Sequence, residues 1–155
     1  MSKDLSKQAK EIIARINYIT IASVTPDSKP WNSPVFSAYD DDYNFYWGTH
    51  KDSQKAKNIA ANENVFLVIY DSTVPPGTGE GVYVKAKAHQ ITKLEEVKKV
   101  FDLLKTRHAT SFWDFAAVGE DGPIRLYKAI PEKVWMSDGD SKNGHYVDIR
   151  TEINL

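Results

Sequence analysis

The feature that most limits how this chain can fold is a pair of strand-like segments separated by three consecutive aspartates. Residues 31–39 and 43–47 are rich in aromatic and β-branched side chains, and Asp40, Asp41 and Asp42 form a short polar turn between them. A connection this short joins antiparallel strands, so the two segments predict a β-hairpin. A doubly wound parallel sheet needs a helix after nearly every strand, and the hairpin argues against that architecture.

Hydrophobic periodicity predicts the remaining secondary structure. Helices are expected over residues 3–16, from an N-cap at Asp52 to about Ala61, and after the Thr92 and Glu95 capping box. Strands are expected over residues 18–24, 65–70, 82–89 and 124–136, with an interruption at Pro131 and an irregular segment after Ser137. Several strands with tight turns and helices at intervals favour a mainly β fold, an antiparallel barrel with flanking helices. No repeat or linker divides the chain, so we expect residues 1–155 to form one domain.

Composition excludes several classes of function. The formal net charge is −1, so the chain has no general attraction to nucleic acid or to an anionic membrane. Cysteine is absent, which removes disulfides, thiolate nucleophiles and cysteine-bound metals, and the four histidines lack metal-ligand spacing. No apolar run could span a membrane, and residues 1–4 lack the apolar core of a signal peptide. We therefore expect a cytoplasmic protein with no metal site, no nucleic-acid partner and no membrane partner.

One loop carries the pattern of a phosphate site. An aromatic run ends at Trp47 and Gly48, and Thr49, Ser53 and Lys55 follow where a helix opens. Hydroxyls, a lysine and the free N–H groups of a helix N-terminus are the groups that hold a phosphate. Surface residues beside any helix start could show the same spacing. The strand before the loop and the apolar strand after it favour phosphate binding.

Three motifs follow one another in this part of the chain: residues 31–36 in the hairpin, residues 47–49 at a strand end, and residues 53–55 opening a helix that ends near residues 61–65. In this order they resemble the FMN-binding split-barrel family, which includes pyridoxamine 5′-phosphate oxidase and the general-stress flavoproteins. The resemblance covers residues 18–135. It implies an antiparallel split β-barrel of six or more strands in a Greek-key-like order, and a homodimer with FMN in the cleft between its subunits.

The resemblance also implies which residues contact the cofactor. Lys55 matches the phosphate lysine of the family, whereas Gln54 stands where the oxidase has an arginine, so one phosphate charge is missing. Trp135 lies two residues before the position that aligns with a tryptophan on the last strand of the oxidase. The expected cofactor residues are Asn32, Ser33, Pro34, Val35, Trp47, Gly48, Thr49, Ser53, Gln54, Lys55 and Trp135.

The chemistry that the resemblance implies has two alternatives. One is an FMN-dependent oxidoreductase that moves a hydride or electrons between FMN and a reduced nicotinamide or another small substrate. The other is a stress-related flavin carrier without fast turnover; similar families bind a deazaflavin or haem on this barrel. No catalytic residue can be assigned from the sequence. The arginine-rich closing signature of the oxidase is absent, with Arg150 alone in the tail, so we expect no oxidation of pyridoxamine phosphate.

Overall fold

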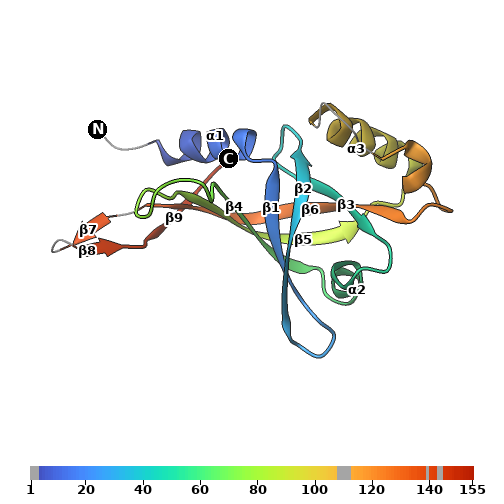
Figure 1. Ribbon diagram of the computed structural model, residues 1–155, viewed down its shortest axis with the longest axis horizontal. Coiled ribbons are helices and arrows are strands. Elements are labelled where there is room, and N and C mark those ends of the chain that lie inside the picture. The colour runs from blue at the N-terminus through green and yellow to red at the C-terminus, as the bar shows by residue number, and fades with distance from the viewer. Residues whose placement is uncertain (1–3, 108–112, 139, 143–144) are drawn as a thin grey trace.

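The computed structural model describes residues 4–107, 113–138, 140–142 and 145–155, and its strands form an antiparallel barrel (Figure 1). The barrel strands are β1 (Tyr18–Val24), β2 (Pro30–Tyr39), β3 (Phe45–His50), β4 (Asn64–Tyr70), β5 (Gly81–Gln90) and β6 (Ile124–Ser137). They follow the order β3-β2-β1-β4-β5-β6, and pairing of β3 with β6 closes the barrel. A seventh strand, β9 (Arg150–Ile153), pairs with β6 outside it, and β7 (Asp140–Lys142) pairs with β8 (His145–Val147). The mainly β split-barrel class predicted from the sequence is confirmed.

Alternate side chains of the strands fill the barrel. In β1, Ile19 and Ile21 are buried, whereas Tyr18 and Thr20 lie on the outer face. This is the period of two that a strand with one buried face requires. At the centre, Trp47 has no exposed surface and stacks on Tyr127, with 5.8 Å between ring centroids and 12° between ring planes.

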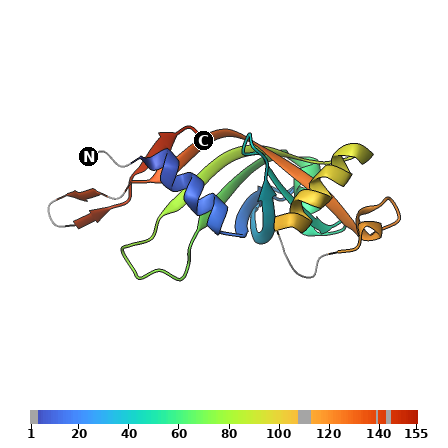
Figure 2. The ribbon, with the colours of Figure 1, turned by 90° about the horizontal axis from the view of Figure 1, so that it is seen from above.

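In the described residues three α-helices flank the strands: α1 (Leu5–Arg15), α2 (Gln54–Ala61) and α3 (Leu94–Arg107), and a short 3-10 helix, η1 (Phe115–Val118), precedes β6. Figure 1 shows α1 and α2 on opposite sides of the strands, and Figure 2 shows α1 and α3 at the barrel surface with one end of each toward the other. Buried residues of α1 and α2 belong to the same cluster as the barrel interior, whereas α3 packs on the outer face of β2, β3 and β6. No helix in the described parts of the chain is long and apolar enough to cross a bilayer.

Arg107 joins the end of α3 to the end of α1. Its guanidinium donates hydrogen bonds to the carbonyl oxygens of Ile13 (2.8 Å) and Ile16 (2.9 Å) and lies over the Tyr39 ring, 5.0 Å from its centroid. The last carbonyls of a helix have no partner inside that helix. Although Arg107 is the last residue of α3, its guanidinium satisfies carbonyls at the end of α1.

The structure corrects the boundaries of the predicted phosphate loop. β3 does not stop at Gly48 but continues to His50, because the last residues of β3 pair with β6. The N-cap of α2 is Ser53 and not Asp52, since the Ser53 hydroxyl accepts a hydrogen bond from the backbone N–H of Ala56 at 3.2 Å. The loop between strand and helix is therefore shorter than the sequence indicates.

Two segments are more regular than expected. β6 runs through Pro131, because a register shift opposite Lys85 and Ala86 of β5 accommodates the proline in a bulge. The tail, predicted to be irregular, contains β9, which pairs Ile153 with Val134. A four-residue strand of mixed composition carries too little periodicity to be found from sequence.

Candidate functional site

The barrel opens between β2 and β3. The ladder that joins these strands has three residue pairs, from Ser37–Trp47 to Tyr39–Phe45. Beyond it, residues 30–36 of β2 pair with β1, and residues 48–50 of β3 pair with β6. Figure 1 shows the β1–β2 hairpin projecting from the barrel near α2. The first turn of α2 therefore lies at the point where the two strands separate.

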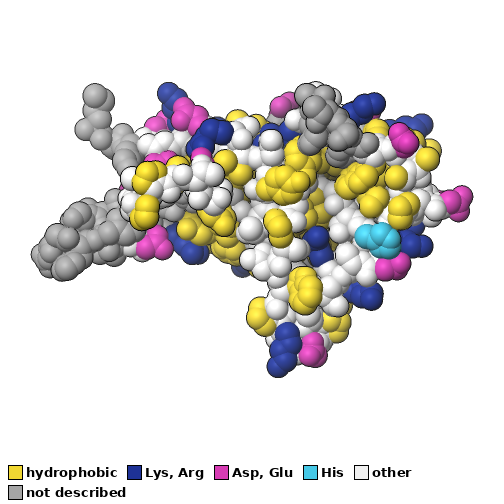
Figure 3. Space-filling model, viewed as in Figure 1, with side chains coloured by type: hydrophobic (Ala, Val, Ile, Leu, Met, Phe, Trp, Pro, Cys, Tyr) yellow, Lys and Arg dark blue, Asp and Glu magenta, His cyan; other side chains and the backbone are white. Residues whose placement is uncertain are grey.

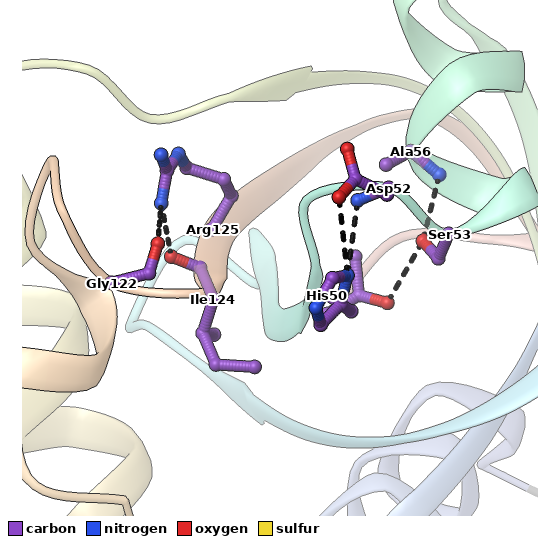
Figure 4. A network of polar contacts seen from close by, with 8 residues as sticks. His50, Asp52, Ser53, Ala56, Gly122, Ile124 and Arg125 are labelled. Carbon is purple, nitrogen blue, oxygen red and sulfur yellow. Dashed lines mark hydrogen bonds and ion pairs between the residues drawn. The ribbon is translucent and has the colours of Figure 1, made fainter.

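Two hydroxyls lie at the start of α2. The Thr49 and Ser53 oxygens are 3.2 Å apart. The Ser53 hydroxyl also caps the helix at Ala56 (Figure 4). Thr49 is buried because it occupies an inward-facing position of β3. The next residue, His50, is exposed, and its Nδ1 accepts a hydrogen bond from the Asp52 N–H at 3.2 Å. The two hydroxyls thus lie together between the end of β3 and the start of α2, whereas the imidazole of His50 is bonded within the turn.

Lys55 is the buried charged side chain of the described residues. It is 9% exposed, and within the part of the chain that the structure describes its ammonium has no hydrogen bond or ion pair. Burial lowers the pKa of Lys55, because partial loss of water without a counter-charge disfavours the charged ammonium. The N–H groups of the first helical turn also lack intrahelical acceptors. An anion at this position would satisfy both the ammonium and the helix terminus.

β2 carries a hydroxyl on the segment that has separated from β3. The Ser33 oxygen is buried and has no hydrogen-bond partner in the described structure. Ser33 and Val35 point to the inner side of the strand, whereas Asn32 and Pro34 are exposed. Residues 32–35 therefore border the opening on two faces. Their contact with a cofactor stays a prediction.

Trp47 and Gly48 lie beside the opening but are occupied by packing. Trp47 is enclosed in the barrel core, as described above. The space next to Gly48 holds the Trp113 ring, whose Cζ3 would be 2.3 Å from a Cβ added to the glycine. The structure thus gives both residues a packing role.

Trp135 lies apart from the other expected cofactor residues. It is on the outer face of β6 and stacks on Phe66, with 6.1 Å between ring centroids. Thr49 pairs with Arg125, ten residues earlier in β6, a path of about 33 Å along a strand. One chain does not bring Trp135 and Thr49 together, so a cofactor could contact both residues only between two copies of the chain.

Sequence reasoning missed a buried polar chain behind the site. Asn58 has no exposed surface; its amide nitrogen donates to the Ser23 hydroxyl at 3.0 Å, and its oxygen accepts from the Gln54 amide at 2.8 Å. The Gln54 side chain is thus bound along the helix. The available signal was an asparagine beside Ile59 on the apolar side of a short helix.

The four arginines of the chain all contact other parts of it. Arg125 donates to the carbonyl oxygens of Gly122 (2.8 Å) and Ile124 (2.9 Å), and Figure 4 shows it turned toward Gly122 and away from Ser53. Arg107 binds the end of α1 as described above. The remaining contacts are the Arg15–Asp71 ion pair at 2.5 Å and the Arg150 guanidinium 3.7 Å from the centroid of the Tyr83 ring.

Comparison with known proteins identifies the family. The family model described as pyridoxamine 5′-phosphate oxidase matches residues 5–138. A search of curated proteins finds no significant match.

Solved structures show the same fold at low sequence identity. The heme storage protein HutZ from Vibrio cholerae has a TM-score of 0.72 at 15% identity, covering 85% of this chain and 94% of HutZ. A heme-binding protein from Mycobacterium smegmatis has a TM-score of 0.71 at 14% identity, covering 97% of this chain and 59% of that protein. An FAD-binding protein from Mesorhizobium loti has a TM-score of 0.63 at 17% identity, covering 84% and 92%. At these identities the similarity shows the fold alone, and the three proteins are described as binding different ligands, heme or FAD.

Proposed function

Because this chain belongs to the pyridoxamine 5′-phosphate oxidase family, we propose that it binds FMN, with the phosphate at the start of α2. The observation that carries the proposal is Lys55, a largely buried side chain whose ammonium has no protein partner among the described residues. The hydroxyls of Thr49 and Ser53 lie beside the same helix terminus. A phosphate held by these groups gains charge-assisted hydrogen bonds, each worth about 1.5–3 kcal/mol.

The flavin ring would lie along residues 32–35 of β2. This part of β2 has separated from β3, so its backbone N–H and C=O groups on that side are not used by the β2–β3 ladder. The ring edge of a flavin carries hydrogen-bond donors and acceptors, and it could pair with such a strand edge. The unpartnered Ser33 hydroxyl adds one further group on the same segment.

We propose that the protein acts as an oxidoreductase. FMN, when bound, supplies hydride and electron transfer. The residues of this chain would orient the ring along β2, hold the phosphate through Lys55 and exclude water from one side of the ring. The hydride donor would be a reduced nicotinamide or another small substrate; no residue is assigned to proton transfer.

The proposed homodimer rests on the outer face of the barrel. Two neighbouring cross-strand rows lie there. The first is mainly apolar and aromatic, with Thr20, Val68, Tyr83 and Trp135, and the second has Ala22 and Phe66 followed by two exposed lysines, Lys85 and Lys133. α3 covers a different face, that of β2, β3 and β6. Figure 3 shows hydrophobic side chains at the surface between the projecting hairpin and α3. A second copy on the two rows would cover apolar surface and bring Trp135 of one chain toward the opening of the other.

A ligand titration tests cofactor binding. Purified protein should bind FMN with micromolar or tighter affinity and quench its fluorescence, whereas haemin should give no Soret shift typical of axial ligation. Two of the compared structures are described as haem proteins, so haem is the competing ligand. Tight haemin binding together with indifference to FMN would overturn the proposal.

Anaerobic mixing tests the activity. If the protein is an oxidoreductase, reduced nicotinamides should bleach the bound flavin, and oxygen should restore its absorption. A flavin that stays oxidised with every donor supports the alternative, a flavin carrier.

A further inference from the structure

Three polar side chains connect the start of α2 to the barrel wall. The Gln54 amide nitrogen donates to the Asn58 oxygen at 2.8 Å, and the Asn58 amide nitrogen donates to the Ser23 hydroxyl of β1 at 3.0 Å. Asn58 has no exposed surface, and Ser23 is 4% exposed. Burial of a polar group costs free energy of folding unless the group is hydrogen-bonded. Here the buried groups of Asn58 and Ser23 are hydrogen-bonded to each other and to Gln54.

α2 needs an anchor because it is short. It has eight residues, and isolated helices of this length are unstable in water. Its buried apolar residues are Ala56 and Ile59, and apolar contacts do not have the directionality of a hydrogen bond. Among the hydrogen bonds of the described residues, Asn58–Ser23 is the one that links a side chain within α2 to a strand. This bond therefore restricts rotation of the helix about its axis.

The orientation of α2 determines where Lys55 lies. Lys55 and Asn58 are three residues apart, so they lie on the same side of the helix. A rotation of α2 would move the buried ammonium of Lys55 relative to Thr49, which belongs to β3 and does not move with the helix. Gln54, four residues before Asn58, is bound to Asn58 and supports the same orientation.

We infer that Asn58 is a positioning residue of the anion site: bound to Ser23 and Gln54, it sets the orientation in which α2 presents Lys55 to a phosphate. This inference rests on the proposed function, because it assumes that the site holds a phosphate. Asn58 does not itself touch the ligand. Its loss should therefore weaken recognition of the phosphate and leave recognition of the flavin ring intact.

The experiment compares FMN with riboflavin, which has the same ring and no phosphate. For Asn58→Ala and Ser23→Ala, we expect the dissociation constant of FMN to rise by a factor of ten or more, whereas that of riboflavin stays within twofold of wild type. The double variant should lose no more than the larger single loss, because both substitutions break one connection. Val100→Ala, in the buried cluster under α3, is the matched control: it lowers stability but keeps the wild-type ratio of the two affinities.

The outcomes separate this inference from the proposed function. If wild type binds FMN and Asn58→Ala leaves the ratio of FMN to riboflavin affinity unchanged, the positioning role is wrong and flavin binding stands. Parallel loss of both affinities means a general structural role and also overturns the inference. If wild type does not bind FMN, the proposed function fails and this inference fails with it. Should Asn58→Ala not fold, as judged by circular dichroism, Ser23→Ala decides the question alone.

Discussion

The Trp113 ring occupies the space in which a side chain at position 48 would lie: a Cβ added to Gly48 would be 2.3 Å from Trp113 Cζ3 and 3.2 Å from Leu126 Cδ2. The sequence assigns Gly48 to a cofactor loop. In the structure the glycine lets an aromatic ring approach the backbone of β3 directly before Thr49. The end of β3 is therefore held by Trp113 from one side and by β6 from the other.

Gly48→Ala should displace Trp113 and destabilise the protein. Overpacking of this kind costs about 1–3 kcal/mol, and the tryptophan fluorescence should change as the ring moves. Urea denaturation measures the loss. Gly79→Ala is the matched control, since its added Cβ would meet Val74 at 4.0 Å, an ordinary contact. Equal stabilities of the two variants would contradict the packing role.

Lys55→Met should have opposite effects on the free and the ligand-bound protein. Loss of a hydrogen bond to a charged group, about 1.5–3 kcal/mol, should weaken FMN binding by roughly 10- to 150-fold. The free protein should become more stable at neutral pH, because the variant no longer removes an ammonium without a protein partner from part of its water. Thermal denaturation with and without FMN measures both effects. A free variant less stable than wild type would show that the ammonium is solvated or paired.

Phe66→Lys should dissociate the proposed dimer. Phe66 stacks on Trp135 in the centre of the two outer rows, and its cross-strand neighbour is Lys85. A further ammonium beside Lys85 would be unpaired and therefore costly at an interface. Sedimentation should show wild type at twice the 17.5 kDa of one chain and the variant near that mass. Lys105→Glu, an exposed charge reversal on α3, should stay dimeric. A monomeric wild type with FMN bound would refute the dimer.

The protein should not oxidise pyridoxamine or pyridoxine phosphate. A substrate phosphate needs its own cationic clamp, which in proteins is usually an arginine. Here Arg107 and Arg125 are bound to backbone carbonyls, Arg15 is paired with Asp71, and Arg150 lies on a tyrosine ring. The assay is release of pyridoxal phosphate under air with saturating FMN. A rate well above that of heat-killed protein would contradict this expectation.

Acid should weaken the turn between β2 and β3. Burial alone would raise the pKa of Asp40. Hydrogen bonds from Asn44, Tyr46 and the Asp42 N–H together have the larger effect, so the pKa of Asp40 lies below its ordinary value. A carboxyl with a lowered folded pKa contributes stability that is present above about pH 4 and is lost as the pH falls through the folded pKa.

Asp40→Asn should therefore lower stability at pH 7, by about 1–3 kcal/mol, and flatten the pH dependence below pH 4. Urea midpoints measured from pH 2 to pH 7 give both quantities. Asp41→Asn, a substitution at an exposed position of the same turn, is the control. The same acid slope in wild type and Asp40→Asn would rule out this role for Asp40.

Local patterns were enough to predict much of the fold. The alternation of Ile19 and Ile21 with polar neighbours places β1 correctly, and the three aspartates mark the turn that makes the sheet antiparallel. Both are properties of a few adjacent residues, and short-range sterics and burial determine them.

Features of the candidate site that depend on distant contacts could not be predicted. The burial of Lys55 follows from the packing of α2 against the barrel, and the hydrogen bond between Ser23 and Asn58 joins residues 35 positions apart. The continuation of β3 through Gly48 requires a partner strand more than 70 residues later. No local pattern in this chain records these pairings.

The pairing of β9 has a consequence for solubility. The first half of β6 is covered along its edge by β3, and its last residues, from Val134 to Ser137, are covered by β9. Without β9 those residues would present free backbone groups directly beside the aromatic outer face at Trp135. An open strand edge next to apolar surface is a template for intermolecular β-pairing. The short strand β9 thus protects the barrel against aggregation by closing this edge, while its Ile153 packs against the core.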